Sequence, residues 1–156
     1  MKKLTPTQKL EGNVAVVTSK AGPVFNGCTV AWITRFSINP PLVGVALSKD
    51  RFTYWVINQS KNFVLNLLTD DAKGISLAKH FGTTSGRNVD KFTKIKYFLG
   101  ATDNPILKDA AAYMECKVIK KCTVGDHILF VGQVVTEKNI TDKTVLSRLT
   151  LRKKNL

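Results

Sequence analysis

Short apolar runs separated by polar turns dominate the chain, and this pattern predicts a mainly β protein. The valine-rich segment Asn13–Ser19 is predicted to be a first strand, and Ala21-Gly22-Pro23 is predicted to turn the chain. Two more strands are predicted over Cys28–Phe36 and, after a Pro-Pro pair that suits the start of a strand, over Leu42–Ser48. Because Leu42–Ser48 is apolar on both faces, we expect it to be a central strand.

Two short helices are expected in the middle of the chain. The first spans Phe52–Asn58 and has Thr53 as its candidate N-cap. The strand Phe63–Leu68 follows it. A second helix is predicted to start at Thr69-Asp70-Asp71, where acidic residues suit the first turn. Its apolar face carries Ile75, Ala78 and Phe81 at spacings of three, His80 lies in its last turn, and Gly82 is the expected C-terminal cap.

The last third of the chain is strand-like after Asn104-Pro105. Ala112–Thr123 and His127–Lys138 are two long runs separated by Val124-Gly125-Asp126, a combination that predicts a long hairpin. The strands do not alternate with long helices, which argues against a parallel α/β sheet. The pattern as a whole predicts an antiparallel β-barrel decorated by short helices.

Length and composition favour one globular domain. A chain of 156 residues with 44% hydrophobic and 22% charged residues can bury its own core. No apolar window is long enough to span a membrane. The N-terminus MKKLTPTQKLEGN has no apolar segment behind its lysines, so we expect no secretory signal and a cytoplasmic location.

The net charge of +13 is the strongest bias in the composition. Such a charge suits a nucleic acid, an acidic partner or an anionic ligand, and the alternative is a lysine-rich solvated surface. The basic residues are scattered, and no RRM, KH or zinc-finger signature is present, so nucleic-acid binding is not favoured. The three cysteines form no Cys-x-x-Cys pair, and neither a disulfide framework nor a metal site is expected.

The best local candidate for chemistry is the segment Ser48-Lys49-Asp50-Arg51-Phe52-Thr53. It follows a buried strand and opens a helix, so hydroxyls, cations and free helix N–H groups would meet as a phosphate requires. The alternative is a solvated loop with an ordinary N-cap. The common glycine-rich phosphate motifs G-x-G-x-x-G and G-x-x-x-x-G-K-[ST] are absent, so any cofactor must be held in another way.

A second candidate is Asn26-Gly27-Cys28-Thr29, which is expected at the start of a strand. Its small side chains leave room for a flat ring to lie against the backbone, since nothing bulky follows until Trp32. The alternative is a tight turn into a core strand, with Cys28 as a small packing residue. His127, after Gly-Asp, could donate a hydrogen bond and change charge near neutral pH, or could be an exposed turn residue.

The order and spacing of these segments, from about residue 10 to residue 138, resemble the flavin reductase-like family of FMN-binding split barrels. The resemblance rests on NGCTVAWITRFSINPPLVGVALSKDRFTYWVI, on NFVLNLL, on the loop SGRNVDKF and on GDHILFVG. The loop is most similar to the ferric reductase and flavoredoxin branch. The resemblance implies one domain over residues 1–156, folded as an antiparallel Greek-key split β-barrel with a few short helices. The ending TVLSRLTLRKKNL departs from the Pro-Leu and aromatic strand that often closes family chains.

The resemblance also implies a site. Cys28, Thr29, Val30 and Ala31 would line the flavin ring, with Cys28 near its reactive edge. The expected phosphate contacts are Ser48, Lys49, Arg51, Phe52 and Thr53. Asn66 is a further polar candidate, and Arg87 and Lys91 would hold the phosphate or a second ligand. His127 is the candidate substrate-side residue.

The implied activity is that of an NAD(P)H-dependent flavin or ferric reductase. The expected cofactor is FMN, with FAD as an alternative, and the expected assembly is a homodimer. Electrons would pass from NAD(P)H to free flavin, a ferric chelate or a redox protein. The alternatives are a flavoredoxin-type electron carrier without NAD(P)H activity of its own and, in a different class, a basic nucleic-acid-binding barrel.

Overall fold

The computed structural model describes residues 3–156, and these fold around a single antiparallel sheet. Within that range seven strands join in the order β2-β1-β5-β8-β9-β4-β3. Their bounds are β1 Ala15–Ala21, β2 Val24–Val30, β3 Ile33–Ser37, β4 Leu42–Ser48, β5 Asn62–Leu68, β8 Ala110–Val124 and β9 His127–Asn139. A separate ribbon pairs β6 Tyr97–Leu99 with β7 Pro105–Leu107. The expected mainly β antiparallel fold is confirmed.

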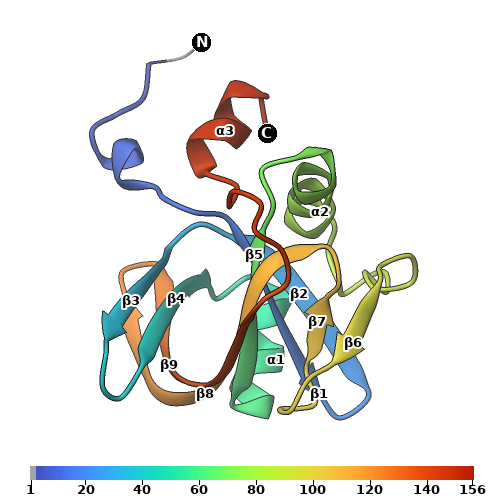
Figure 1. Cartoon of the computed structure of the whole chain (residues 1–156). Coiled ribbons are helices and arrows are strands. Elements are labelled where there is room, and N and C mark those ends of the chain that lie inside the picture. Colours follow the sequence, from blue (N-terminus) through green and yellow to red (C-terminus); the bar gives the residue numbers. More distant parts are fainter. Residues whose placement is uncertain (1–2) are drawn as a thin grey trace.

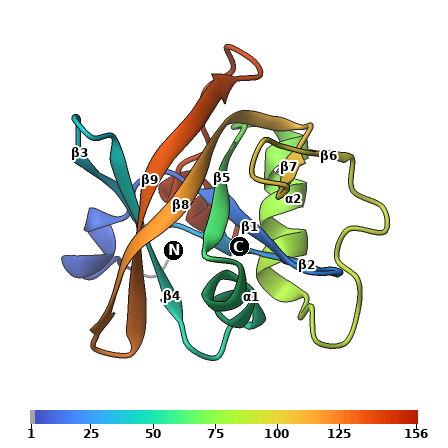
Figure 2. The ribbon, with the colours of Figure 1, turned by 90° about the horizontal axis from the view of Figure 1, so that it is seen from below.

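The helices lie at the margins of the sheet. The structure places α1 at Phe52–Ser60, α2 at Ala72–Thr83, α3 at Arg148–Lys153 and a 3-10 turn, η1, at Thr7–Leu10. The contacts of α1 are mainly with β1 and β2, and α2 packs against β2 and β1 (Figure 2). Figure 1 shows α3 and η1 beyond one end of the sheet, with α3 close to one end of α2 and η1 on the other side of α3.

Several predicted elements are confirmed, with observed bounds that match or lie close to the predicted ones. β4 occupies the predicted Leu42–Ser48 and pairs on both sides, with β3 and β9. The long hairpin β8–β9 turns at Gly125-Asp126, where Gly125 has the positive φ of 60° that a tight turn requires. In α2, Ala78 and Phe81 are buried and Ile75 is partly buried against the same core, so the predicted apolar face is correct.

The single strand predicted over Cys28–Phe36 is wrong. β2 begins at Val24 and ends at Val30, and β3 begins at Ile33 on the opposite edge of the sheet. Asn26 to Thr29 therefore lie inside β2 rather than at the start of a strand. In the described residues no ladder joins β2 to β3, so the sheet stays open between these two edges. The break at Ala31-Trp32 creates this seam.

Two predicted caps and the strand-like C-terminus are also corrected. Arg51, in extended conformation, is the N-cap of α1, so Thr53 lies inside the first helical turn. Gly82 lies within α2, whose C-cap is Thr84. The end of the chain forms α3 rather than a strand, with Ser147 as N-cap accepting from the backbone N–H of Thr150 at 3.1 Å.

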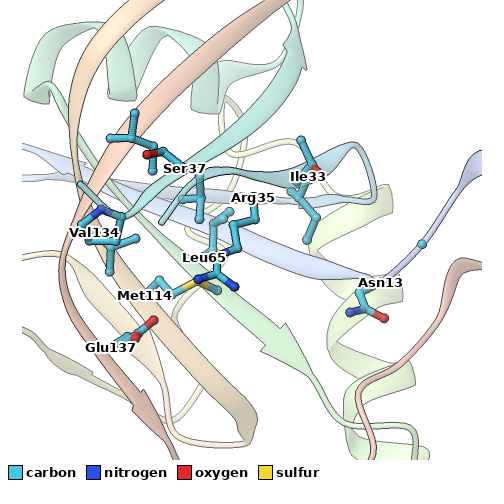
Figure 3. Close-up of a pocket in the computed structure, with 13 residues that line it drawn as sticks. Asn13, Ile33, Arg35, Ser37, Leu65, Met114, Val134 and Glu137 are labelled. Atoms are coloured by element: carbon cyan, nitrogen blue, oxygen red, sulfur yellow. The ribbon is translucent and has the colours of Figure 1, made fainter. Parts of the chain in front are cut away.

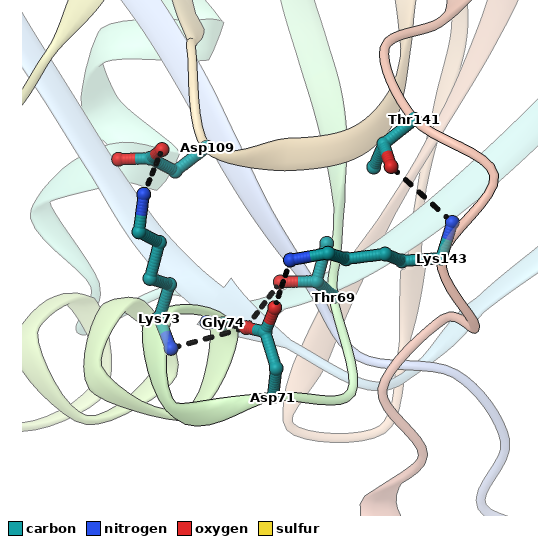
Figure 4. Close-up of polar contacts among 7 residues, drawn as sticks. All are labelled: Thr69, Asp71, Lys73, Gly74, Asp109, Thr141 and Lys143. Carbon is teal, nitrogen blue, oxygen red and sulfur yellow. Dashed lines mark hydrogen bonds and ion pairs between the residues drawn. The ribbon is translucent and has the colours of Figure 1, made fainter.

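Asp71 connects the start of α2 to the C-terminal segment (Figure 4). Its carboxylate accepts from the backbone N–H groups of Lys73 and Gly74, both at 3.0 Å, as an N-cap does. Lys143 donates to it at 2.8 Å, and this contact, with the helix N–H groups, holds the pKa of Asp71 well below its usual range. Thr69, two residues before Asp71, forms an isolated antiparallel β-bridge with Val145. The segment leading to α3 is thus fastened beside the N-terminus of α2.

Candidate functional site

A basic groove with two adjoining parts lies beside the seam of the sheet. The first part, here the helix lobe, is a cavity of about 330 Å³ between the start of α1 and the loop after α2. The second part, here the strand lobe, is a cavity of about 460 Å³ along the ends of β2 and β4. Cys28 and Arg51 line both lobes, so the two form one continuous groove.

Local structure explains why the helix lobe is polar. Its walls are the segments 50–53 and 82–87, with Asn26, Cys28 and Lys91 at its base. Arg51 is the N-cap of α1, but its side chain donates to the carbonyl of Gly82 at 3.5 Å, and no side chain in the part of the chain that the structure describes caps the first N–H groups of this nine-residue helix. Arg87 donates to the carbonyl of Asp50 at 2.8 Å and covers the ring of Phe52. Free helix N–H groups and two guanidinium groups make this lobe suited to an anion.

Lys91 is a buried cation at the base of the helix lobe. Its residue is only 4% exposed, and Nζ donates to the carbonyl oxygens of Gly27 at 2.8 Å and Phe81 at 3.2 Å. Among residues 3–156 no carboxylate forms an ion pair with it. Burial lowers the pKa of Lys91 to about 8. A buried cation without an acidic partner is expensive to maintain, and a bound anion would neutralise it.

Asn26 offers an unsatisfied acceptor in the same lobe. Its Nδ2 donates to Oγ1 of Thr53 at 2.9 Å, while its Oδ1 is buried without a hydrogen-bond partner in the described chain. A Cβ atom on Gly86 would lie 2.0 Å from this oxygen, so only glycine allows the loop to come this close. Buried acceptors are normally paired, and a ligand hydroxyl would supply the missing donor.

The strand lobe exposes backbone and small side chains. It is lined by residues 28–32 and 46–48, with Arg51 and His127 at its margins. Oγ1 of Thr29 donates to the carbonyl of Ala78 at 2.6 Å, which fixes β2 against α2. Cys28 is 2% exposed, and burial raises the pKa of its thiol, so the group is a neutral contact at pH 7.

His127 opens β9 opposite Ser48 and lies at the mouth of the strand lobe. Its ring is 4.4 Å from that of Trp32, and its Nδ1 donates to Oδ1 of Asp126 at 2.6 Å. This hydrogen bond lowers the pKa of Asp126. The carboxylate therefore holds the imidazole with Nδ1 as donor, which leaves Nε2 as the free ring nitrogen.

Most of the residues predicted for the site meet in this groove, but two do not line it. Asn66 is fully buried in the sheet, where it donates to Val16 and Thr18 and accepts from the N–H of Leu107. Lys49 is exposed and lines neither lobe. The sequence analysis placed Asn26 in a candidate segment but did not predict its buried, unpaired oxygen in the described chain. It also missed the close approach of Gly86 and two residues from distant parts of the chain, Glu11 and Arg148, which no local pattern marks.

The geometry fits a phosphorylated flat ligand such as FMN. The helix lobe supplies cations, helix N–H groups and an unpaired acceptor, which suit a phosphate and a polyhydroxyl chain. The strand lobe supplies an open backbone edge for a flat, polar-edged ring. If FMN binds here, Lys91, Arg51, Arg87 and the start of α1 would hold its phosphate, and residues 28–31 would lie along its ring.

Fold and groove together define an open antiparallel β protein with a basic groove that suits an anionic ligand. Residues 7–148 match the family described as flavin reductase like domain, and the chain belongs to this family. Two solved structures share the fold over most of their length. An FMN-binding protein from Thermus thermophilus is 33% identical, with a TM-score of 0.80 over 90% of this chain and 78% of that one. The flavin reductase HpaC, solved with NADP+, is 30% identical, with a TM-score of 0.76 over 88% of this chain and 90% of that one.

Longer proteins contain a similar segment. The high molecular weight rubredoxin of Moorella thermoacetica is 33% identical over 132 residues, which cover 84% of this chain and 55% of that protein. The chain spans still less, about a quarter or a fifth, of the diflavin flavoproteins that it also matches. In residues 3–156 we find no helix with the length and apolar character needed to cross a membrane.

Proposed function

We propose that the chain, acting as one domain over residues 1–156, binds FMN in the groove and uses NAD(P)H to reduce free flavin, a ferric chelate or a redox protein. The observation that carries this proposal is the buried Lys91, which has no carboxylate partner in residues 3–156 and shares the helix lobe with the start of α1. This lobe adjoins the open backbone of residues 28–31. The likeness to an FMN-binding protein and to a reductase solved with NADP+ supports it.

The residues of the chain bind and orient rather than exchange protons. Bound FMN would supply the hydride chemistry, so no catalytic triad is required. Lys91, Arg51 and Arg87 anchor the phosphate, and Asn26 accepts from a hydroxyl of the ribityl chain. His127 and Trp32 border the open side of the strand lobe, where the nicotinamide ring of the donor would approach. Nε2 of His127 can hydrogen-bond to that second substrate.

The visible absorption spectrum of the purified protein tests this proposal. We expect a flavin spectrum that bleaches when NADH or NADPH is added without oxygen. A flavin spectrum that neither nucleotide bleaches would support the second candidate, an electron carrier reduced by a protein, which the match to a segment of a rubredoxin favours. Protein that takes up neither FMN nor FAD on reconstitution would overturn both.

We also propose that two copies of the chain pair through the outer face of the edge strand β3. Trp32, directly before β3, and Phe36, on β3, are 53% and 52% exposed, and Leu10 of η1, 86% exposed, lines a surface cavity together with Trp32. The inner face of β3 borders a separate cavity of about 550 Å³, into which Arg35, Met114 and Glu137 project (Figure 3). Exposed aromatic side chains on an open sheet edge are typical of interfaces.

Light scattering after size exclusion tests the pairing. We expect the mass of two chains for the wild type and of one chain for Phe36→Asp, because a carboxylate would be buried in the interface without a partner. Val124→Asp, at the exposed tip of the β8–β9 hairpin, is the matched control and should remain paired. A single-chain mass for the wild type at micromolar concentration would contradict the proposal.

A further inference from the structure

Arg148 brings the C-terminal helix into the groove. It is the first residue of α3 and lines the strand lobe together with Glu11, from the opposite end of the chain. It also lines an adjoining cavity of about 250 Å³ between β2, α2 and α3, which Arg51 shares. Its side chain is 29% exposed, so the guanidinium is partly shielded from water and still open to the groove.

The position of Arg148 is fixed by its neighbours. Its Nε lies 3.6 Å from Oε2 of Glu11, and its Nη1 donates to the backbone oxygen of Leu156 at 2.9 Å. The carboxylate of Glu11 also accepts two hydrogen bonds from Arg152, both at 2.9 Å. Leu151, buried to 4% exposure, anchors the helix beneath them. The guanidinium therefore stands at the lobe in a defined orientation.

The charges around the strand lobe do not cancel. Glu11 is the only carboxylate among the described residues that line this lobe, and two arginines on α3 already share it. Arg51, on the opposite wall, adds a further positive charge. The lobe thus holds more positive charge than its own carboxylate can neutralise, even though Lys91 lines only the helix lobe. A ligand with negative charge on the part seated here would be favoured.

We propose that Arg148 is a flavin-binding residue, which contacts the ring portion of the flavin in the strand lobe and favours the reduced form over the oxidised form. This inference rests on the proposed function. Reduced flavin carries more negative charge on its ring than oxidised flavin at neutral pH, and a fixed cation beside the ring is one means by which a protein tunes a flavin. Within this site, the helix lobe selects the phosphate and Arg148 acts on the ring.

Titration with two ligands separates the two lobes. Arg148→Gln should weaken the binding of FMN and of riboflavin by the same factor, about tenfold for one hydrogen bond from a charged group. Lys91→Met should weaken the binding of FMN and leave that of riboflavin nearly unchanged, because riboflavin has no phosphate. Lys153→Gln removes an exposed charge from the same helix and should affect neither ligand. Quenching of flavin fluorescence gives the dissociation constants.

The midpoint potential of the bound FMN gives a second readout. Arg148→Gln should make the potential more negative than it is in Lys153→Gln. The expected shift is about 30 mV for each tenfold loss of preference for reduced over oxidised FMN in a two-electron couple. Arg148→Lys keeps a cation on α3 and should restore most of the potential.

Two results would overturn the role of Arg148. The first is that Arg148→Gln has the same flavin dissociation constants and the same midpoint potential as Lys153→Gln. The second is that Arg148→Gln weakens the binding of FMN but not that of riboflavin. If the wild type binds neither FMN nor riboflavin, the proposed function itself fails. Circular dichroism confirms that each variant is folded before titration.

Discussion

Lys91→Met is expected to weaken FMN binding about 100- to 1,000-fold at pH 7. The substitution removes a buried cation that would be paired with the phosphate, and breaking such a pair costs about 3–5 kcal/mol, where each 1.4 kcal/mol is a factor of ten. We expect a loss at the lower end of this energy range, because Arg51, Arg87 and the start of α1 would still face the phosphate. The dissociation constant from fluorescence quenching measures the effect.

Lys94→Met is the matched control for this prediction. Lys94 is exposed in the same loop region, so its loss changes the net charge equally without touching the groove. We expect its dissociation constant to stay within about twofold of the wild type, as is usual for an exposed charge. Equal affinities in Lys91→Met and Lys94→Met would remove Lys91 from the phosphate site.

The pH dependence gives Lys91 a further signature. Its pKa of about 8 lies below the ordinary 10.5, so between these values the folded chain holds fewer protons than the unfolded chain. In flavin-free protein its contribution to the free energy of unfolding therefore rises with pH across this window. FMN binding prefers the charged amine, and its affinity should fall as the pH rises above about 8. Lys91→Met should abolish both the rise of the free energy of unfolding with pH and the fall of FMN affinity above about pH 8.

Gly74→Ala is expected to lower the free energy of unfolding by about 2–3 kcal/mol. Alanine normally stabilises a helix by about 1 kcal/mol relative to glycine. At Gly74, however, the added Cβ would lie 1.9 Å from the backbone oxygen of Thr69. Backbone atoms cannot swing aside, so overpacking outweighs the gain in helix propensity. The cap at Asp71 and the bridge from Thr69 to Val145 would shift together.

Gly82→Ala, in the same helix, is expected to change the free energy of unfolding in the opposite direction. A Cβ there would meet only atoms of Thr29, at 3.5 Å, an ordinary contact. We expect no loss, and a gain of up to about 1 kcal/mol. Urea denaturation of the flavin-free proteins, followed by circular dichroism, compares the two variants. Equal stabilities would contradict the close approach of α2 to Thr69.

The elements that the sequence predicts well carry their signals locally. β4 shows an unbroken apolar run after two prolines, and the β8–β9 hairpin has its glycine at the turn. The start of α2 is marked by its acidic residues, although Asp71 is the N-cap and the first turn, where acidic residues were predicted, contains none. For the site, the basic and hydroxyl-bearing segment after β4 was identified from its own composition. Lys91 came only from the resemblance, because nothing in its neighbourhood predicts that a lysine will be buried.

The elements that the sequence misses depend on distant contacts. The apolar run continues through Ala31-Trp32, so the break that sends β3 to the other edge is invisible in the pattern. The helix α3 has six residues, too few to be stable alone, and it forms because Leu151 and Glu11 hold it. The unpaired oxygen of Asn26 exists only because a loop 60 residues further on packs against it at Gly86.

The distribution of the site along the chain sets an order for its assembly during synthesis. The helix lobe uses residues 26–91, so all of its residues are synthesised before His127 and Arg148 of the strand lobe. The strand lobe needs Glu11, His127 and Arg148, and Arg152 closes a contact across 141 residues. Chains grow from the N-terminus at about 5–20 residues per second. Under the proposed function, the residues that would bind the phosphate are therefore synthesised several seconds before Arg148, which completes the lobe that would receive the ring.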